Sequence, residues 1–372
     1  MNYVKLKDVC IINMGQSPDS DSYNENGCGV PFFQGNADFG ERYPVTRKWC
    51  SAPTKMAAPE DILISVRAPI GAMNYAKEEC CIGRGLAALT PNKGKVSPEY
   101  IFWLLKGKNE ELNSKGTGST FKAIGRNILE ETLVPDISLE KQTECAIILE
   151  KAYRVILSRK QQLQKLDELV KARFVEMFGD PEINSFDWPV CTLKELVSVE
   201  PQNGLYKPQS AYVQDGSGFP IVRIDAFYNG RITNFSALKR LECSESEVQR
   251  YLLQENDIVI NRVNSIEYLG KCAHIKGLLE ETVFESNMMR LHLDDTVMNA
   301  VFATKLLCSQ YIYKQIMIRA KKAVNQASIN QQDVLSFRMF VPPLELQEQF
   351  AAFVEQIDKS KVAIQKALDE AQ

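Results

Sequence analysis

The chain has 372 residues, of which 45% are hydrophobic and 24% are charged, so it can bury sizeable cores and is not a disordered protein. This length exceeds one ordinary domain and favours two. A formal net charge of −3 argues against an indiscriminate binder of polyanions, although the local distribution of charge matters more than the total.

Cysteine and histidine usage argues against a disulfide-stabilised protein and against a metal-binding protein. The ten cysteines are scattered without a C-x-x-C pair, and the only histidines are His274 and His292, so no metal-ligand spacing can be assembled. We interpret the cysteines as reduced and mostly buried.

The first residues lack the apolar core of a signal peptide, and no apolar run approaches the roughly 18 residues that span a bilayer. These features predict a cytoplasmic protein.

Short strand-like runs open the chain. The runs 8–13, 31–34, 61–66 and 85–89 are separated by gaps rich in Gly, Pro, Asn, Asp and Ser. These residues are typical of the turns that connect short strands. They predict a mixed, partly barrel-like sheet. The apolar stretch 98–105 then has the character of a buried helix.

A long helix is predicted between residues 139 and 177. Apolar side chains recur there every seven residues, at Leu149, Ile156, Leu163, Val170 and Met177. Such a stripe is typical of a coiled-coil seam, and the segment would be ~60 Å long at 1.5 Å per residue. Gly179 is expected to end it. The alternative is a helix that packs only on its own domain.

The second half of the chain repeats the first in the same order. The matching segments are 6–9 and 193–196, 61–65 and 257–261, and 134–142 and 341–349. In the last pair, Val134-Pro135 matches Val341-Pro342 and Gln142 matches Gln349. A second, shorter stripe follows at Phe350, Ile357 and Ile364.

This repeat predicts an α+β fold with an approximate two-fold axis. Two mixed-sheet domains are expected to be separated by two long antiparallel coiled-coil helices. The expected boundaries are 1–137 for the first sheet domain, 138–179 for the central spacer, 180–341 for the second sheet domain and 342–372 for the C-terminal spacer.

Two strings suggest catalysis, but the repeat argues against both. Asp136, followed by Glu140 and Lys141, suggests a metal-dependent nuclease, yet it matches Pro343 in the second copy. The loop 116–120 is rich in glycine like a phosphate-binding loop. The corresponding loop of the second copy, 323–327, has no glycine. We therefore predict no catalytic, cofactor-binding or metal-binding residue in this chain.

Basic and amide side chains at matched places suggest recognition of nucleic acid instead. Segment 305–330 holds five basic residues and no acidic one, and 106–126 has a net charge of three. Arg, Lys, Asn and Gln bind phosphates and read base edges. The candidate DNA-binding residues are Gln34, Asn36, Arg67, Ser119, Thr120, Lys122, Arg126, Arg223, Arg262, Asn264, Arg319, Lys321, Lys322, Asn325 and Gln326. The alternative for each is a solvated surface side chain.

The order of these elements resembles the specificity subunit of type I restriction-modification systems. The resemblance covers nearly the whole chain and rests on the paired openings, the paired strands at 61–65 and 257–261, and above all the paired junctions at 134–142 and 341–349. It implies two target-recognition domains, each reading one half of a split site in double-stranded DNA. The two helices would set the gap between the halves and dock partners.

The resemblance also implies a non-catalytic role. Two modification (methyltransferase) subunits would bring S-adenosylmethionine, and restriction/translocase subunits would bring ATP and Mg²⁺. Two other functions stay open: a standalone nuclease or methyltransferase with an unrecognised site, and a coiled-coil scaffold with no nucleic-acid role.

Overall fold

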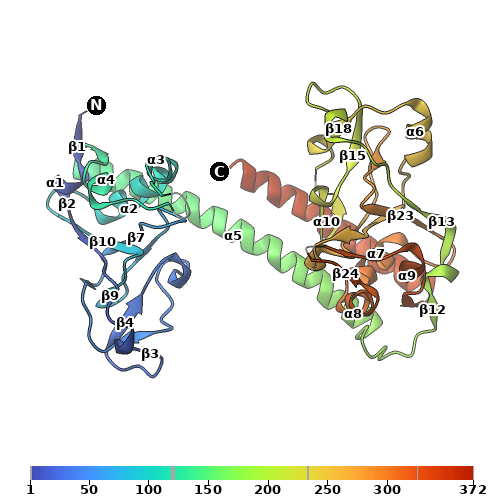
Figure 1. Cartoon of the computed structure of the whole chain (residues 1–372), viewed down its shortest axis with the longest axis horizontal. Coiled ribbons are helices and arrows are strands. Elements are labelled where there is room, and N and C mark those ends of the chain that lie inside the picture. The colour runs from blue at the N-terminus through green and yellow to red at the C-terminus, as the bar shows by residue number, and fades with distance from the viewer. Residues whose placement is uncertain (1, 119–121, 233, 325, 372) are drawn as a thin grey trace. The chain divides into compact units, whose positions relative to one another are not determined.

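The computed structural model describes residues 2–118, 122–232, 234–324 and 326–371 (Figure 1). It confirms an α+β fold with two repeated halves and two long helices. Contacts group the chain into two units, whose main segments are Met1–Leu157 and Ser158–Glu370. This division cuts the central helix in two. Within the described ranges, no helix is both long and apolar enough to cross a membrane.

The first unit contains a four-stranded sheet of order β2-β10-β7-β8, a five-stranded sheet of order β3-β5-β4-β9-β6 and the pair β1-β11. Its strands are β1 (Tyr3–Lys5), β2 (Cys10–Met14), β3 (Tyr23–Asn24), β4 (Val30–Phe33), β5 (Trp49–Cys50), β6 (Met56–Ala57), β7 (Ile62–Ser65), β8 (Met73–Tyr75), β9 (Cys80–Ile82), β10 (Leu86–Pro91) and β11 (Leu133–Pro135). Its helices are α1 (Leu6–Val9), α2 (Pro98–Gly107), α3 (Asn109–Ser114), α4 (Arg126–Glu130) and the first part of α5 (Leu139–Phe178).

The second unit contains a six-stranded sheet of order β13-β23-β19-β21-β17-β16, a four-stranded sheet β14-β18-β15-β22, a three-stranded sheet β20-β25-β24 and the pair β12-β26. Its strands are β12 (Val190–Thr192), β13 (Val197–Asn203), β14 (Tyr212–Val213), β15 (Phe219–Val222), β16 (Phe227–Tyr228), β17 (Gly230–Ile232), β18 (Lys239–Leu241), β19 (Ile258–Asn261), β20 (Val263–Asn264), β21 (Cys272–His274), β22 (Val283–Phe284), β23 (Met288–Leu293), β24 (Lys321–Lys322), β25 (Ala327–Ser328) and β26 (Arg338–Phe340). Its helices are the rest of α5, α6 (Glu245–Tyr251), α7 (Ala300–Leu307), α8 (Gln310–Arg319), α9 (Gln331–Leu335) and α10 (Leu344–Asp369).

The two units share one topology, which confirms the repeat. The order β2-β10-β7-β8 recurs as β13-β23-β19-β21, and β3-β5-β4-β9 recurs as β14-β18-β15-β22. In both copies the pair β4-β9 or β15-β22 is parallel, and the other pairs among these sixteen matched strands are antiparallel. The second unit adds the hairpin β16-β17 at the edge of its larger sheet.

A buried carboxylate precedes the central strand in each copy. Asp61 accepts a hydrogen bond from the Thr90 hydroxyl (2.7 Å), and Asp257 contacts Nδ1 of His292 (2.8 Å). Each carboxylate also accepts a backbone N–H from three residues earlier. Burial raises the pKa of both carboxyls. His292 is therefore the partner of a buried structural carboxylate.

A buried glutamine fixes the start of each long helix. The Nε2 of Gln142 and of Gln347 donates to the carbonyl five residues earlier, at 2.8 Å in both copies. Their Oε1 atoms accept from the backbone N–H of Ser97 and Asn299 (2.8 and 2.9 Å), the N-cap residues of α2 and α7. Each glutamine thus ties a long helix to the helix that covers its sheet.

The match of the two junctions expected from the sequence is wrong by two residues. Strand β11 pairs with β1, and β26 pairs with β12 in the same register. This register determines which residue after β11 corresponds to which residue after β26. The Val-Pro string recurs by sequence, but only its first occurrence lies in the strand. The structural pairs are Val134 with Met339, Asp136 with Val341 and Gln142 with Gln347, in place of Val341, Pro343 and Gln349.

Only part of the expected helical seam is buried. Leu149 is exposed, so its assignment to a buried seam is wrong. The buried seam residues are Val170, Phe350 and Ile357, and the half-buried ones are Ile156, Leu163, Met177 and Ile364. In the second unit, α10 runs antiparallel to the last turns of α5 (Figure 1). Phe178 packs on Phe350, and Lys361, later in α10, pairs with Asp167, earlier in α5.

The heptad rule missed the main aromatic contacts of α5. Phe174 and Phe178 lie one and two turns beyond Val170 and pack on Phe302 and Phe350, with ring centroids 4.6–5.5 Å apart. They belong to the core of the second unit itself. This end of α5 therefore follows the 3.6-residue spacing of a helix on its own domain, which the sequence left open as the alternative.

Candidate nucleic-acid interface

A small strand junction recurs after the central strand of each unit. In the first unit, Arg67 and Thr117 both form a β-bridge to Ala123. In the second, β20 and β24 both pair with β25. Segments about 60 residues apart in sequence therefore meet beside the central strand in each copy.

Four exposed side chains gather around this junction in the first unit. We call them the first loop cluster: Gln34, Arg67, Arg84 and Lys122. Ala68 N donates to the Lys122 carbonyl (3.0 Å), and Val66 N donates to the Gly85 carbonyl (2.9 Å). Among the described residues, none of the three cationic side chains in this cluster has a hydrogen-bond or ion-pair partner.

Glycine allows the chain segments of this cluster to cross at backbone contact. A Cβ on Gly85 would lie 2.3 Å from the Gln34 carbonyl oxygen, and one on Gly15 would lie 2.2 Å from that of Gly83. The counterpart of Gly15 is Gly204, where a Cβ would lie 2.3 Å from two carbonyl oxygens. The crossing is therefore a fixed part of the framework in both copies, and it presents the Arg84 side chain outward.

The second unit carries a corresponding set around the hairpin β24-β25. We call it the second loop cluster: Asn264, Lys321, Lys322 and Gln326. Asn264 pairs with Ala327 across β20-β25, and Lys322 pairs with Ala327 from the other side. Lys321, Lys322 and Gln326 are exposed, whereas Asn264 is half-buried and accepts a hydrogen bond from Ser265 N (2.8 Å). Neither lysine has a partner within the part of the chain that the structure describes.

Most other basic residues of the two predicted segments are held by protein groups. Lys314 pairs with Glu182 (2.7 Å), and Lys305 donates to the Asn229 carbonyl (2.8 Å). In the first unit, Lys108 and Lys115 share Glu111 (2.6 and 2.5 Å). Fewer basic side chains of these two segments are therefore free to contact phosphates than the residue count indicates.

Two of the predicted DNA-binding arginines also serve the fold. The guanidinium of Arg126 pairs with Glu130 (3.0 Å) and donates to the Ile12 carbonyl. Arg319 donates through Nε to Ser336 (2.8 Å) and through Nη1 to the Gln315 carbonyl (2.9 Å). Both side chains are occupied at the base of their loops.

The remaining candidates line the crossing of the chain. Arg223 lies over the Tyr212 ring and 3.7 Å from Glu285, while Arg262 donates to the Ser286 carbonyl (3.1 Å). Burial lowers the pKa of Arg262. Asn36 is half-buried in the turn after Gln34. Ser119, Thr120 and Asn325 lie outside the described residues.

Arg84 was not among the predicted residues. It stands between two glycines in the turn from β9 to β10, and Ser286 occupies this place in the second unit. The string Gly83-Arg84-Gly85, set between two buried strands, is the signal that could have identified it. A lone arginine flanked by glycines marks a turn whose only side chain is basic.

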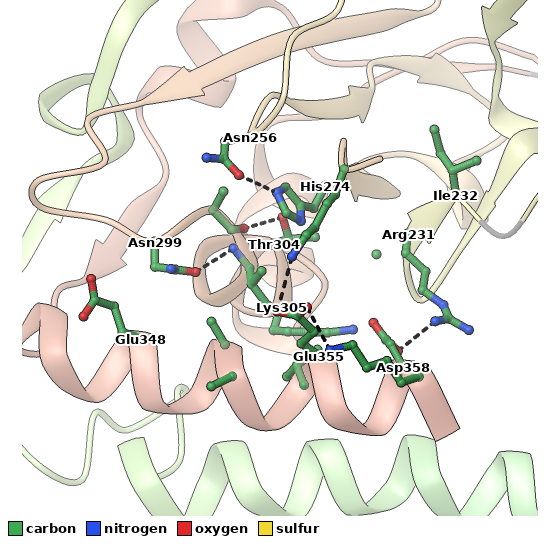
Figure 2. A pocket seen from close by; sticks show the side chains of 18 of the residues that line it. Arg231, Ile232, Asn256, His274, Asn299, Thr304, Lys305, Glu348, Glu355 and Asp358 are labelled. Carbon is green, nitrogen blue, oxygen red and sulfur yellow. Dashed lines mark hydrogen bonds and ion pairs between the residues drawn. The ribbon is translucent and has the colours of Figure 1, made fainter. Parts of the chain in front are cut away.

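A groove of about 840 Å³ beside α10 has a different character (Figure 2). Its cations are matched by anions: Arg231 pairs with Asp358 (2.9 Å) and Lys276 with Glu355 (3.3 Å). His274 contacts the Asn256 side chain (3.1 Å), and burial lowers its pKa to about 4. This internal pairing does not suit a phosphate backbone. Across the ranges that the structure describes, no group of three His, Cys, Asp or Glu side chains is placed to hold a metal ion.

Comparisons with known proteins agree with the repeated fold. A solved type I restriction-modification S subunit from M. genitalium matches all of this chain and 92% of its own, with a TM-score of 0.62 and 14% identity. At that identity the likeness concerns the fold.

Two sequence relatives are also named as specificity subunits of type I restriction enzymes. The chain is 41% identical over 160 residues to a putative type I restriction enzyme specificity subunit of Methanocaldococcus jannaschii, a match that spans 43% of this chain but only 38% of that protein. It is 24% identical over 336 residues to the EcoKI specificity subunit of Escherichia coli, covering 84% of this chain and 71% of that protein. The family model for the type I restriction modification DNA specificity domain matches twice, over residues 1–168 and 186–371. The chain therefore belongs to the type I restriction-modification DNA specificity family.

Proposed function

We propose that the chain is the DNA sequence-recognition subunit of a type I restriction-modification complex and that it is not itself catalytic. Each unit would read one part of a two-part DNA site. The observation that carries this proposal is the recurrence of one framework with a loop cluster at the same place in each copy. The framework is conserved between the copies while its exposed polar side chains differ, as two modules reading different half-sites require.

The two loop clusters divide the chemistry of recognition. Lys122, Lys321 and Lys322 are exposed cations that would contact phosphates and give the binding its salt dependence. Arg67, Arg84 and Gln34 in the first cluster, and Asn264 and Gln326 in the second, would read base edges, because arginine and amide side chains bond two atoms of one base. Arg223, Arg262 and Arg319 would hold the loops in position.

The long helices would set the gap between half-sites and dock modification subunits. Ile148 and Val155 of α5 are 66% and 48% exposed, and their seven-residue spacing places them on one face of the helix. Exposed apolar side chains that share a face mark interaction surfaces. We infer two modification subunits that carry S-adenosylmethionine, together with restriction/translocase subunits that use ATP and Mg²⁺. Such a complex would act on DNA in the cytoplasm.

Reconstitution tests this function. The chain, assembled with its modification subunits and S-adenosylmethionine, should methylate adenines at one two-part site, and mapping those adenines would give both half-sites and the gap. The purified chain alone, with DNA, Mg²⁺ and S-adenosylmethionine, should show no turnover. Turnover by the chain alone would contradict the proposal in favour of an enzyme, and a complex that binds no DNA would favour a scaffold.

A further inference from the structure

Two cysteines 36 positions apart in the sequence meet in the second unit. Cys272 lies on β21 and Cys308 follows the last residue of α7, and their sulfur atoms are 3.4 Å apart. Cys272 is fully buried, whereas Cys308 is exposed. The sequence-based interpretation of the cysteines as mostly buried small hydrophobic residues does not fit this exposed member of a pair.

The two thiols have different chemistry. A hydrogen bond from Cys272 lowers the pKa of Cys308, with a further contribution from the Lys305 ammonium, although desolvation opposes it. The same hydrogen bond and complete burial raise the pKa of Cys272 well above its usual value. The contact with Cys272 and the Lys305 ammonium favour a thiolate at Cys308, whereas complete burial disfavours one at Cys272.

A nearby ammonium group supports this assignment by geometry. A Cβ placed on Gly230 would lie 3.6 Å from both Cys308 Sγ and Lys305 Nζ, so these two atoms are at most about 7 Å apart. Lys305 is held there by its hydrogen bond to the Asn229 carbonyl (2.8 Å). Figure 2 shows Lys305 and Thr304 side by side on α7. Cys308 lies between the C-terminal end of α7 and the N-cap residue of α8, so the two helix dipoles oppose each other there and the Lys305 ammonium is the charge that favours a thiolate.

One residue of the pair is exposed and borders a groove. Cys308 lines a groove of about 490 Å³ between the last turns of α5 and the start of α8, together with Lys305, Asp167 and Tyr311. Cys272 has no exposed surface and lies behind Cys308. An oxidant that enters the groove therefore meets Cys308 first.

We propose that Cys308 and Cys272 form a peroxide-sensitive thiol pair. The Cys308 thiolate attacks a peroxide oxygen, the O–O bond breaks, and after protonation of the leaving oxygen the products are a sulfenic acid and water. The Cys272 sulfur then attacks the sulfenic sulfur, an S–S bond forms, and a second water leaves with the Cys272 proton. The two thiols lose two electrons to one hydrogen peroxide. The disulfide would join β21 to the end of α7.

The other cysteines provide internal comparisons. Cys50 and Cys81 also lie against each other, but both are fully buried. Cys28 and Cys145 are exposed, and neither has a cysteine partner among the described residues. In the part of the chain that the structure describes, only Cys272 and Cys308 combine contact between sulfurs with one exposed residue.

Peptide mass spectrometry on the full chain tests the pair. After brief exposure to hydrogen peroxide and alkylation of the remaining thiols, we expect a peptide linking Cys272 to Cys308, lighter by two hydrogen atoms and lost on reduction. Before oxidation, iodoacetamide should alkylate Cys308 severalfold faster at neutral pH than Cys28 or Cys145. Cys308 remaining a free thiol, or linking no more often than the exposed single cysteines do, would overturn the proposal.

Two variants assign the steps. In Cys272→Ser, Cys308 should accumulate as a sulfenic acid that dimedone traps. In Cys308→Ser, Cys272 should stay a thiol at the same peroxide dose, since it is buried. Both changes keep a small polar side chain, and circular dichroism checks that the variants are folded. A disulfide from Cys272 to another cysteine in Cys308→Ser would contradict the order of attack.

Discussion

At the residue scale, Gln347 is the buried glutamine that corresponds to Gln142, whereas the sequence match paired Gln142 with Gln349. Gln347 is fully buried and uses both ends of its amide, donating to Pro342 O and Val297 O and accepting from Asn299 N. Gln349, two residues later, is exposed. The two glutamines therefore form a matched pair of test sites on one helix.

Gln347→Ala should destabilise the protein by about 1–3 kcal/mol, because it leaves buried backbone groups without partners. Gln349→Ala should change the stability by less than about 0.5 kcal/mol, as an exposed substitution does. Urea unfolding of the full chain measures both. Equal effects at the two positions would mean that the register of α10 is wrong.

His274 makes stability depend on pH. Burial lowers its pKa to about 4 from 6.5, so between these values the unfolded chain binds a proton that the folded chain does not. Stability from this group is therefore complete above about pH 6.5 and is lost as the pH falls toward about 4, by an upper bound of about 3 kcal/mol.

The variant His274→Gln isolates this contribution. Its amide can still donate to Asn256, but it does not titrate in this range, so its unfolding free energy should fall less on acidification than that of the parent chain. Urea midpoints measured across the window give the comparison. Parallel pH profiles for the two proteins would show that His274 does not resist protonation in the folded state.

At the element scale, the second half of α5 belongs to a folded core as well as to a spacer. Phe174 contacts Phe302, Phe340 and Phe350, so the helix, the sheet-covering helix α7 and α10 share one aromatic cluster. Val175, the next residue, is 49% exposed.

Phe174→Ala should cost about 3–5 kcal/mol, through lost burial and the cavity that remains. Val175→Ala, on the exposed face of the same turn, should cost less than about 1 kcal/mol. Thermal or urea unfolding of the second unit's transition measures the difference. A small effect at Phe174 would contradict the packing of α5 against α10.

Sequence reasoning succeeded where a pattern depends on the element alone. The runs at 61–66 and 85–89 became β7 and β10, and the helix expected over 139–177 became α5, because alternation, apolar runs and Gly179 act locally. The register of β26 could not be read from the letters, since Val-Pro recurs while the hydrogen bonds align Met339 with Val134.

The sequence located the segments that form the candidate site, but it did not show which of their side chains are already bonded within the protein. The sequence placed basic residues at 67, 122, 321 and 322, and these are exposed and unpaired within the described ranges. It could not show that Arg319 is held by Ser336, because that contact depends on how α8 packs on α9. Arg84 was missed because one basic residue between two glycines makes no charge run.

At the scale of the whole molecule, the hairpin β24-β25 is expected to supply phosphate contacts. In the assembled complex, Lys321→Ala with Lys322→Ala should weaken binding to all DNA sequences and reduce the slope of log K against log salt by roughly 2, since each phosphate contact contributes about 0.9. Lys314→Ala, which removes a lysine already paired with Glu182, should leave the slope unchanged. An unaltered slope in the double variant would remove the hairpin from the interface.

Lengthening α5 tests whether this helix sets the gap between the half-sites. Seven residues inserted after Ser158 lengthen α5 by ~10.5 Å in nearly two whole turns, and they leave the Gln142 contacts and the Lys361–Asp167 pair intact. If α5 sets the gap, the complex should methylate the same two half-sites separated by roughly three more base pairs, at 3.4 Å each. An insertion of five residues rotates the helix by roughly 140° out of phase, so it should abolish methylation of any two-part site. Mapping methylated adenines distinguishes the outcomes. An unchanged gap with the seven-residue insertion would show that the spacing is set elsewhere.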